Sequence, residues 1–247
     1  GARRHAARRR SGRACGHPHR LGERLAAGWR PLDPGSVMPP LAGLYAITSA
    51  AVCADDARLL AAVTAALRGG ARWVQYRDKH ASAAQRLRRA AALVSCCHAH
   101  GAGLIVNDDL PLALAVDADG VHLGAGDGDL GSARAQLGAN RVLGVTCGDD
   151  LARARRAVDH GASYVAFGRL YPSNTKPDAP PARLETLREA ARSLPVPVCA
   201  IGGITPARLP AVTATGARLI AVVDGLFGAD DIELAARAYL RGLGPYN

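Results

Sequence analysis

The sequence predicts a single (β/α)8 barrel, a TIM barrel of the α/β class, and three observations support this prediction. Short β-branched runs alternate with segments of helical period from residue 44 onward, and eight such pairs occur. The length of 247 residues matches the roughly 250 residues of a typical barrel of this kind. The residues after the first predicted strand are Ser-Ala-Ala-Val-Cys, whereas a doubly wound dinucleotide-binding sheet would carry a Gly-x-Gly-x-x-Gly turn there.

The predicted strands and helices follow one another in strict alternation. The strands are expected at Leu44–Thr48, Trp73–Tyr76, Leu104–Val106, Gly120–Leu123, Val142–Thr146, Tyr164–Phe167, Val198–Ile201 and Leu219–Val223. The Ala/Leu/Arg-rich segments between them predict helices near residues 55–68, 82–100, 110–116, 130–137, 150–160, 182–193, 206–215 and 230–241. Eight parallel units with right-handed crossovers can close into a barrel, which removes exposed sheet edges. Because barrel enzymes carry their chemistry where strands end, the polar residues directly after each strand are the candidate site residues.

The net charge of +10 lies mostly at the N-terminal end of the chain. Residues 1–37 hold nine Arg against Glu23 and Asp33, a net charge of +7, whereas residues 38–247 hold 22 basic and 19 acidic side chains. The Gly, Pro and Arg content of residues 1–37, without hydrophobic periodicity, is typical of disorder. We therefore expect a disordered basic extension over residues 1–37 and a catalytic barrel domain over residues 38–247.

The basic extension could bind nucleic acid or act as a transit peptide. It lacks the serines and the amphipathic pattern of a transit peptide and the interleaved aromatic residues that stack on bases. We expect no nucleic-acid partner. The chain's only methionine, Met38, lies just before the first predicted strand, so the expectation is that translation of the native protein begins there.

Membrane insertion and secretion are not indicated by the sequence. No run approaches the roughly 18–20 consecutive apolar residues that cross a bilayer, so we expect no membrane partner. The six cysteines have no paired short spacings and no secretory segment precedes them. This pattern favours the reducing cytoplasm. A homo-oligomer is left open by the sequence.

The end of the second predicted strand carries three polar side chains that alternation places on one side: Gln75, Arg77 and Lys79. An amide, a guanidinium and an ammonium group that converge in this way suit a diphosphate or another dianion. The alternative is an ordinary solvated strand end. Lysine usage favours the binding site, because the chain contains 29 Arg and only two Lys, Lys79 and Lys176, and both follow a predicted strand.

Carboxylates follow the third and fourth predicted strands. Asp108 and Asp127 would face one cavity from adjacent strand ends, and Mg²⁺ needs only one or two carboxylates in addition to water and substrate phosphate oxygens. The alternative is that Asp109 and Asp127 cap helices. His122, near the end of the fourth strand, is expected to be a structural histidine of the strand interior, with a substrate role as the alternative.

The last three strand ends suggest a phosphate site. The loop after the sixth strand, residues 168–177, is long for a βα connection and carries Ser173, Thr175 and Lys176. Gly202 and Gly203 follow the seventh strand and would let backbone N–H groups approach an anion. A short helix after the eighth strand would add its positive end.

Six segments, taken together and in this order, resemble the thiamine phosphate synthase family, also called thiamine-phosphate pyrophosphorylase. They are Gly43–Thr48, Gln75–Lys79, Asn107–Asp109, Ala118–Gly124, Pro172–Lys176 and Ala200–Thr205. The resemblance covers about residues 43–226. Individually such segments are weak signals, but six in sequence with barrel spacing are specific.

The resemblance implies that a hydroxymethylpyrimidine diphosphate and a thiazole phosphate are joined to give thiamine phosphate and pyrophosphate, with Mg²⁺ as cofactor. It implies a dissociative reaction, which needs no side-chain nucleophile. Carried over to this sequence, the groups that hold the diphosphate substrate are Gln75, Arg77, Lys79, Asn107, Thr146 and Lys176. The thiazole-phosphate residues are Ser173, Thr175, Gly203, Val223 and Asp224, and the metal ligands are Asp108 and Asp127.

Three positions depart from the family's pattern. Ala125 stands where the family commonly has Gln, Thr146 where it has Ser, and Asp224 where a small neutral residue is usual. A carboxylate at residue 224 would repel a phosphate unless it points away.

The nearest alternative function is a thiazole tautomerase of the same fold, in which His122 could act as acid or base. A barrel enzyme that acts on a phosphorylated sugar is a more distant one. The synthase is favoured over the tautomerase because a tautomerase has little use for a diphosphate and magnesium site, whose residues would be Arg77, Lys79, Asp108, Asp127 and Lys176.

Overall fold

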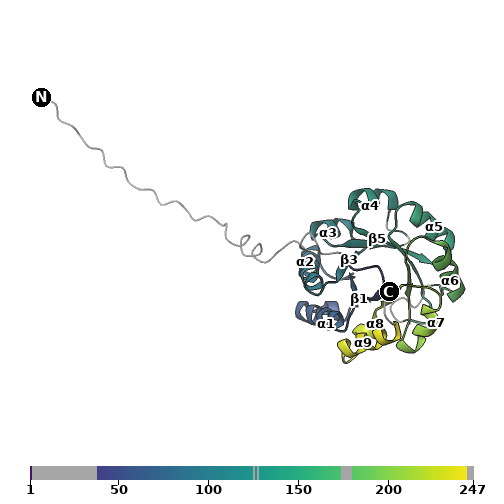
Figure 1. Cartoon of the computed structure of the whole chain (residues 1–247). Coiled ribbons are helices and arrows are strands. Elements are labelled where there is room, and N and C mark those ends of the chain that lie inside the picture. The colour runs from purple at the N-terminus through teal and green to yellow at the C-terminus, as the bar shows by residue number, and fades with distance from the viewer. Residues whose placement is uncertain (2–37, 125, 127, 174–179, 244–247) are drawn as a thin grey trace. The chain divides into compact units, whose positions relative to one another are not determined.

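A computed structural model describes residues 1, 38–124, 126, 128–173 and 180–243. Its eight parallel strands pair in chain order, and the eighth pairs with the first to close the barrel. The helices surround the strands as a ring that also runs in chain order (Figure 1). The predicted (β/α)8 fold is confirmed. The disorder expected for residues 1–37 lies outside the described residues, apart from Gly1.

The predicted strands match the observed ones to within two residues at each end. The strands are β1 Gly43–Ile47, β2 Trp73–Tyr76, β3 Gly103–Asn107, β4 Gly120–Leu123, β5 Val142–Gly148, β6 Tyr164–Phe167, β7 Val198–Ile201 and β8 Leu219–Val222. β5 is longer than predicted, and its pairing with β6 shifts between Thr146 and Gly148. This irregularity lies near the C-terminal end of the strand.

The first five α-helices begin where short polar side chains accept backbone N–H groups. Their caps, in chain order, are Asp55, Ser82, Asp109, Asp129 and Asp150. The helices are α1 Asp56–Arg68, α2 Ala83–Ala99, α3 Leu110–Ala115, α4 Leu130–Leu137, α5 Leu151–Asp159, α6 Leu184–Ser193, α7 Leu209–Thr213, α8 Asp224–Phe227 and α9 Ile232–Leu243, with 3-10 turns η1 Val52–Ala54 and η2 Pro206–Arg208.

One predicted helix is divided in the structure. The segment 206–215 forms the turn η2 and the short helix α7. Pro210 has no backbone N–H, so it cannot donate to residue 206 as a continuous α-helix would require. The short helix expected after the eighth strand is present as α8.

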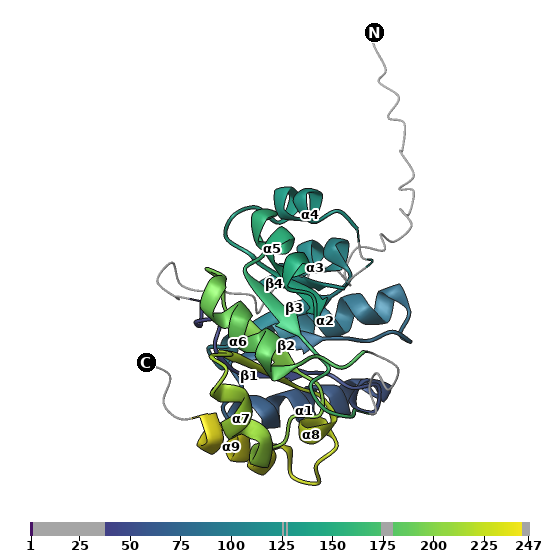
Figure 2. The ribbon, with the colours of Figure 1, turned by 90° about the vertical axis from the view of Figure 1, so that its right-hand side faces the viewer.

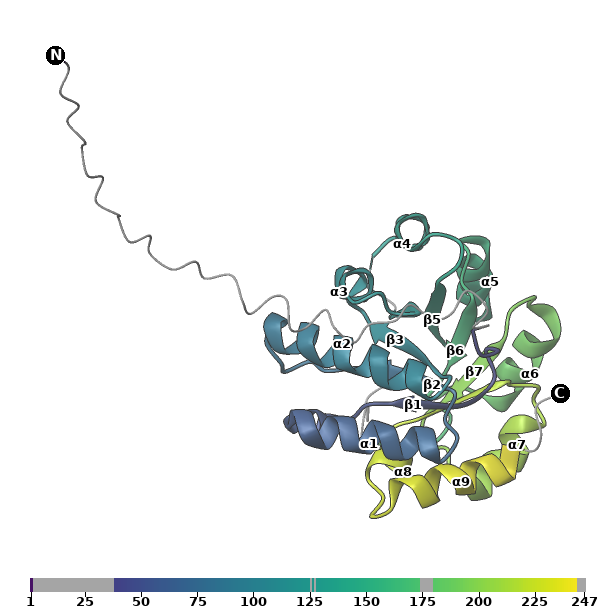
Figure 3. The same cartoon turned by 60° about the vertical axis from the view of Figure 1, so that its left-hand side comes forward.

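The first and last helices of the ring, α1 and α9, pack against each other. α1 packs against both α2 and α9, and Figure 3 shows α1 between them. Seen from the side, α3, α4 and α5 lie on one side of the strands and α7, α8 and α9 on the opposite side (Figure 2). Among the helices that the structure describes, none is long and apolar enough to cross a membrane.

The barrel interior is a separate small core, filled by side chains that point inward from the strands. Trp73, Tyr45 and Tyr164 are fully buried there. Tyr164 has space because the facing position on β5 is Gly144, where a Cβ atom would overlap the tyrosine ring. The indole N–H of Trp73 donates to the carbonyl of Pro40 at 3.0 Å, which holds the segment before β1 against the barrel.

Candidate active site

A cavity of about 1060 Å³ opens among the C-terminal ends of the strands. Ten of the thirteen residues proposed from the sequence line it: Gln75, Arg77, Lys79, Asn107, Asp108, Thr146, Ser173, Gly203, Val223 and Asp224. The remaining three, Asp127, Thr175 and Lys176, lie outside the described residues. The structure therefore gathers every described candidate into one pocket.

The end of β2 alternates as the sequence predicts. Gln75, Arg77 and Lys79 line the cavity, whereas the Tyr76 ring packs into the core outside the barrel. The backbone of Arg77 is fixed by Thr48 of the neighbouring strand end. Its N–H donates to the Thr48 hydroxyl at 2.8 Å, and that hydroxyl donates to the Arg77 carbonyl at 3.1 Å.

Asp78 points away from the cavity and anchors the loop that carries Arg77 and Lys79. Its side chain is 3% exposed and accepts hydrogen bonds from the Arg89 guanidinium at 2.8 Å and from the N–H groups of His80 and Ala81 at 3.1 Å. Burial opposes ionisation of this carboxyl group, but these hydrogen bonds outweigh it and lower the pKa of Asp78. An ionised Asp78 thus holds the loop to α2.

Asp108 and Asp109 have different roles although they are adjacent. Asp108 lines the cavity and lies 3.8 Å from the Lys79 ammonium. Asp109 caps α3 by accepting from the Leu112 N–H at 3.0 Å, and it pairs with Arg86 at 3.3 Å. The capping alternative therefore holds for Asp109, and Asp108 is the carboxylate of the two that lines the cavity.

The backbone of Asp108 explains why neighbouring side chains share one cavity. Its φ of 62° lies in the left-handed region, which Asp tolerates better than most residues. Simple strand alternation would send Asn107 and Asp108 to opposite faces, yet both line the pocket. The Asp108 N–H donates to the His122 carbonyl at 2.8 Å, which ties this turn to β4.

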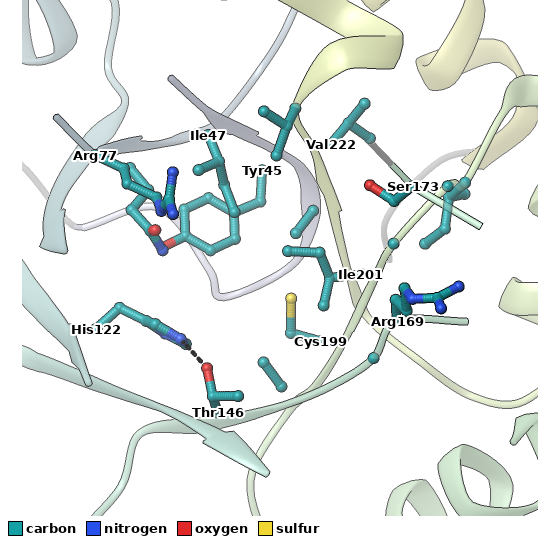
Figure 4. A pocket seen from close by; sticks show the side chains of 18 of the residues that line it. Tyr45, Ile47, Arg77, His122, Thr146, Arg169, Ser173, Cys199, Ile201 and Val222 are labelled. Carbon is teal, nitrogen blue, oxygen red and sulfur yellow. Dashed lines mark hydrogen bonds between the residues drawn. The ribbon is translucent and has the colours of Figure 1, made fainter. Parts of the chain in front are cut away.

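A line of polar side chains crosses the barrel interior at the inner end of the cavity. Gln75 Nε2 donates to Tyr45 Oη at 2.8 Å, and Tyr45 Oη lies 2.9 Å from Tyr164 Oη. Tyr164 Oη lies 2.8 Å from His122 Nδ1. His122 Nε2 lies 2.8 Å from Thr146 Oγ1, as Figure 4 shows. His122 is buried, as expected for a strand-interior histidine, but it also lines the cavity.

The loop after β6 packs against the loop after β7 at the edge of the pocket. The N–H of Tyr171 donates to the Gly202 carbonyl at 3.0 Å. Gly202 and Gly203 both have positive φ, and a Cβ at Gly203 would overlap the Pro172 carbonyl. Figure 4 places Arg77 and His122 on one side of the pocket and Arg169 and Ser173 on the opposite side, so the pocket has two faces that could each hold a phosphorylated group.

Among the described residues, four charged ones that were not selected from the sequence also line the cavity: Asp149, Arg153, Arg169 and Arg208. Asp149 and Arg169 directly follow strands, so the rule that selected the other candidates could have found them. Arg208 gave no such signal, because it lies beyond the loop after β7. Its guanidinium lies 4.5 Å from the centre of the Tyr171 ring and donates to the Gly203 carbonyl.

Asp149, which directly follows β5, binds Arg183 at the start of α6. It accepts from the N–H of Arg183 at 3.0 Å and from its guanidinium at 2.8 Å. Burial opposes its ionisation, but the hydrogen bonds from Arg183 and Thr186 lower the pKa of Asp149. The start of α6 is thereby fixed beside the pocket.

Comparison with known proteins decides the family. The family model described as thiamine monophosphate synthase matches residues 44–226. The chain belongs to this family. The thiamine-phosphate synthase of Alcanivorax borkumensis is 52% identical over 200 residues, which cover 80% of this chain and 92% of that protein. The thiamine-phosphate synthase of Chromobacterium violaceum is 52% identical over 202 residues, covering 81% of this chain and 96% of that protein.

A solved structure supports the same assignment. The thiamine phosphate pyrophosphorylase of Pyrococcus furiosus superposes with a TM-score of 0.74 at 32% identity, covering 81% of this chain and 95% of that one. The resemblance stated from the sequence motifs is confirmed, and the chain is an enzyme of the transferase class.

The described residues of this family member fit a metal that is held largely by its substrate. Among them, no group of three or more His, Cys, Asp or Glu side chains could hold a metal by itself. Mg²⁺ at phosphate sites needs only one or two carboxylates, because water and phosphate oxygens fill the remaining positions. Asp108 supplies one such carboxylate at the cavity wall.

Proposed function

We propose that this chain condenses 4-amino-2-methyl-5-hydroxymethylpyrimidine diphosphate with 4-methyl-5-(2-phosphooxyethyl)thiazole to give thiamine phosphate and pyrophosphate, in the cytoplasm. The observation that carries this proposal is the convergence of two cations, two amides and a carboxylate on one cavity: Arg77, Lys79, Gln75, Asn107 and Asp108.

The cations on the β2 side suit the diphosphate. A planar guanidinium can bind phosphate oxygens with two parallel hydrogen bonds, and an ammonium can follow a leaving group as a point charge. Both belong to a loop that is held by Thr48 on one side and by the buried pair of Asp78 and Arg89 on the other. Donors fixed in this way stabilise charge that develops on the leaving oxygens without further reorganisation.

Asp108 and Asp127 would hold Mg²⁺ with the diphosphate. When bound there, the ion would supply positive charge to the departing pyrophosphate. Asp108 already lies beside the Lys79 ammonium at 3.8 Å, so the carboxylate and the cation would share the same phosphate group.

The proposed substitution is dissociative. The bond from the pyrimidine methylene carbon to the diphosphate oxygen breaks, and pyrophosphate leaves with the electron pair. The electron-rich aminopyrimidine stabilises the methylene cation, and the thiazole nitrogen then supplies the electron pair of the new carbon–nitrogen bond. The chain's own contribution is to hold both substrates in line and to exclude competing water.

This mechanism requires no protein nucleophile, and the thiols of the cavity are consistent with that. Cys147 and Cys199 line the pocket. Burial raises the pKa of Cys147 to about 12 and raises the pKa of Cys199 as well. Both therefore stay protonated near neutral pH and are poor nucleophiles.

The thiazole phosphate is assigned to the opposite face of the pocket. Its proposed ligands there are Ser173, Thr175, Gly203, Val223 and Asp224. Asp224 is exposed at the start of α8 and lines the cavity. In the proposed complex the phosphate would approach the backbone N–H groups of this strand end, because the carboxylate would repel it.

The proposal is tested by incubating the full chain with both substrates and Mg²⁺ and detecting thiamine phosphate and pyrophosphate together. Formation of both products in equal amounts supports the synthase. Isomerisation of the thiazole precursor without pyrophosphate release would instead indicate the tautomerase. The matched control is the same reaction without the thiazole phosphate, in which pyrophosphate release should fall to the rate of hydrolysis.

A further inference from the structure

Five side chains from five different strands form one continuous hydrogen-bonded line inside the barrel. In order they are Gln75 of β2, Tyr45 of β1, Tyr164 of β6, His122 of β4 and Thr146 of β5, and each neighbouring pair lies at 2.8 or 2.9 Å. The first and last members line the cavity, and the line joins them across the interior. We call this line the interior relay.

The interior relay has a direction because each hydroxyl group carries only one hydrogen. Gln75 Nε2 donates to Tyr45 Oη, so the Tyr45 hydrogen is free to go to Tyr164. Tyr164 would then donate to His122 Nδ1, which would have to be unprotonated. A neutral His122 ring would then carry its hydrogen on Nε2 and would donate it to Thr146 Oγ1. The Thr146 hydroxyl, having accepted, would keep its own hydrogen, which it could donate to a ligand in the cavity.

The opposite direction would give a different site. If residue 75 accepted from Tyr45, Tyr164 would donate to Tyr45 and His122 Nδ1–H would donate to Tyr164. The Thr146 hydroxyl would then donate its hydrogen to His122 Nε2, and only its lone pairs would face the cavity. The two directions therefore differ at both ends: in whether residue 75 donates to Tyr45 or accepts from it, and in whether Thr146 can donate to the cavity.

The surroundings of the interior relay favour a single, fixed arrangement. The Tyr45 and Tyr164 rings meet edge to face at 6.0 Å, and the His122 ring stacks on Tyr164 at 5.6 Å. Their neighbours in the barrel interior include Cys199, Ala166 and Ala221. Burial raises the pKa of Tyr45 and Tyr164, so both keep their hydrogens.

We infer that Gln75 sets the direction of the interior relay, and that Tyr45, Tyr164 and His122 are positioning residues which make the Thr146 hydroxyl a hydrogen-bond donor to an oxygen of the bound diphosphate. The catalytic part of this inference rests on the proposed synthase function, whereas the direction of the interior relay does not.

The direction can be read from the ligand-free full chain by nitrogen NMR of ¹⁵N-labelled histidine. The two ring nitrogens of His122 report which of them is protonated, and the His122 signals are assigned by their loss in His122→Gln. We expect a single tautomer with the hydrogen on Nε2. Protonation on Nδ1 in the unmodified protein would overturn the inference.

The decisive variant is Gln75→Glu, because a carboxylate in place of the amide can only accept. The His122 hydrogen should move from Nε2 to Nδ1 once the new carboxyl group ionises, in spectra recorded from about pH 6 to about pH 9. An unchanged tautomer throughout this range would refute control by residue 75. Should this variant not fold, Tyr45→Phe interrupts the same link and should give a mixture of both tautomers, and a single unchanged tautomer would again refute it.

The matched control is Tyr239→Phe. Tyr239 is also buried, and its hydroxyl donates to the Ile204 carbonyl at 2.9 Å, outside the interior relay. This variant also loses one buried hydroxyl hydrogen bond, but the His122 tautomer should not change. A change in this control equal to that in Tyr45→Phe would assign the effect to general loosening and would overturn the inference.

The catalytic part is tested by the split between kcat and KM for the synthase reaction. Thr146→Val removes the donor at nearly constant shape, and it should lower kcat roughly tenfold, the value of one hydrogen bond made in the transition state. Thr146→Ser should retain kcat, and Tyr164→Phe should lower kcat with little change in KM. An unchanged kcat in Thr146→Val would overturn the donor role.

If the unmodified chain makes no thiamine phosphate, the proposed function fails while the NMR result still decides the direction.

Discussion

The Arg89 guanidinium donates to the Asp78 carboxylate at 2.8 Å, with the two side chains 7% and 3% exposed. This buried pair lies behind the strand end that presents Arg77 and Lys79 to the cavity. It connects the stability of the fold to the placement of the proposed diphosphate ligands. Arg89 also donates to Asp56 of α1 at 2.6 Å, so one guanidinium joins α1, α2 and the loop after β2.

Replacing Arg89 by Met should destabilise the fold by about 3–5 kcal/mol, because it leaves a buried carboxylate without its partner. Urea unfolding measures the change. The control is Arg88→Met, since Arg88 is 62% exposed and its Asp56 partner lies at 3.8 Å. That variant should cost less than about 1 kcal/mol. Equal losses in both variants would contradict the anchoring role of Asp78 and Arg89.

Replacing Arg77 by Ala should lower kcat for the synthase reaction by roughly 10²–10³, the usual cost of removing one fixed donor to developing negative charge. The melting temperature should stay within the range of a surface substitution, because the side chain lines an open cavity. Arg77→Lys should recover only part of the loss, since an ammonium cannot bind two oxygens in parallel. Near-normal turnover in Arg77→Ala would remove this residue from the diphosphate site.

Asp108→Asn should raise the Mg²⁺ concentration needed for half-maximal activity, because an amide is a weaker ligand than a carboxylate. The fold should survive, since Asn also tolerates the left-handed backbone found at this position. Asp109→Asn is the matched control, because Asn caps a helix about as well as Asp. Its Mg²⁺ requirement should not change. Full activity of the unmodified chain in excess chelator would refute the metal role.

The sequence predicted the fold and the C-terminal ends of the strands well, because both follow from the periodic spacing of apolar residues along the chain. Alternation after β2 was enough to place Gln75, Arg77 and Lys79 on one side. Alternation alone would place Asp108 on the face opposite Asn107, whereas the positive φ of Asp108 brings both side chains to the cavity. A single residue with a positive φ does not change the spacing of apolar residues, so the sequence pattern does not reveal it.

The interior relay could not be predicted from the sequence for a different reason. Tyr45 and Tyr164 are 119 residues apart in the chain, and they belong to β1 and β6, which are not neighbours in the sheet. Their hydroxyl groups meet only because the barrel closes and both side chains point inward. Local patterns identify inward-facing residues, but the pairing of two such residues across the interior requires the three-dimensional structure.

The pair formed by His98 and Asp119 should make the stability of the barrel depend on pH. His98 Nε2 lies 2.9 Å from Asp119 Oδ2, and the same oxygen accepts from the Leu104 N–H at 2.7 Å. The hydrogen bond to Asp119 raises the pKa of His98 above its usual 6.5, against the opposing effect of burial. A raised pKa means that the folded state holds the proton more tightly than the unfolded state. The stabilisation is therefore complete below about pH 6 and is lost as the pH rises through the folded-state pKa.

The prediction is tested by urea unfolding of the unmodified chain and of His98→Gln at about pH 5.5 and about pH 8.5, either side of the usual histidine pKa. Gln can still donate a neutral hydrogen bond to Asp119 but cannot be protonated. The difference in the free energy of unfolding should therefore be larger at the lower pH and should shrink at the higher one. The control is His100→Gln, because His100 is exposed and its ring bonds only to the Cys96 carbonyl among the contacts within the described part of the chain. A difference that stays constant with pH would show that His98 stabilises the barrel by packing rather than by charge.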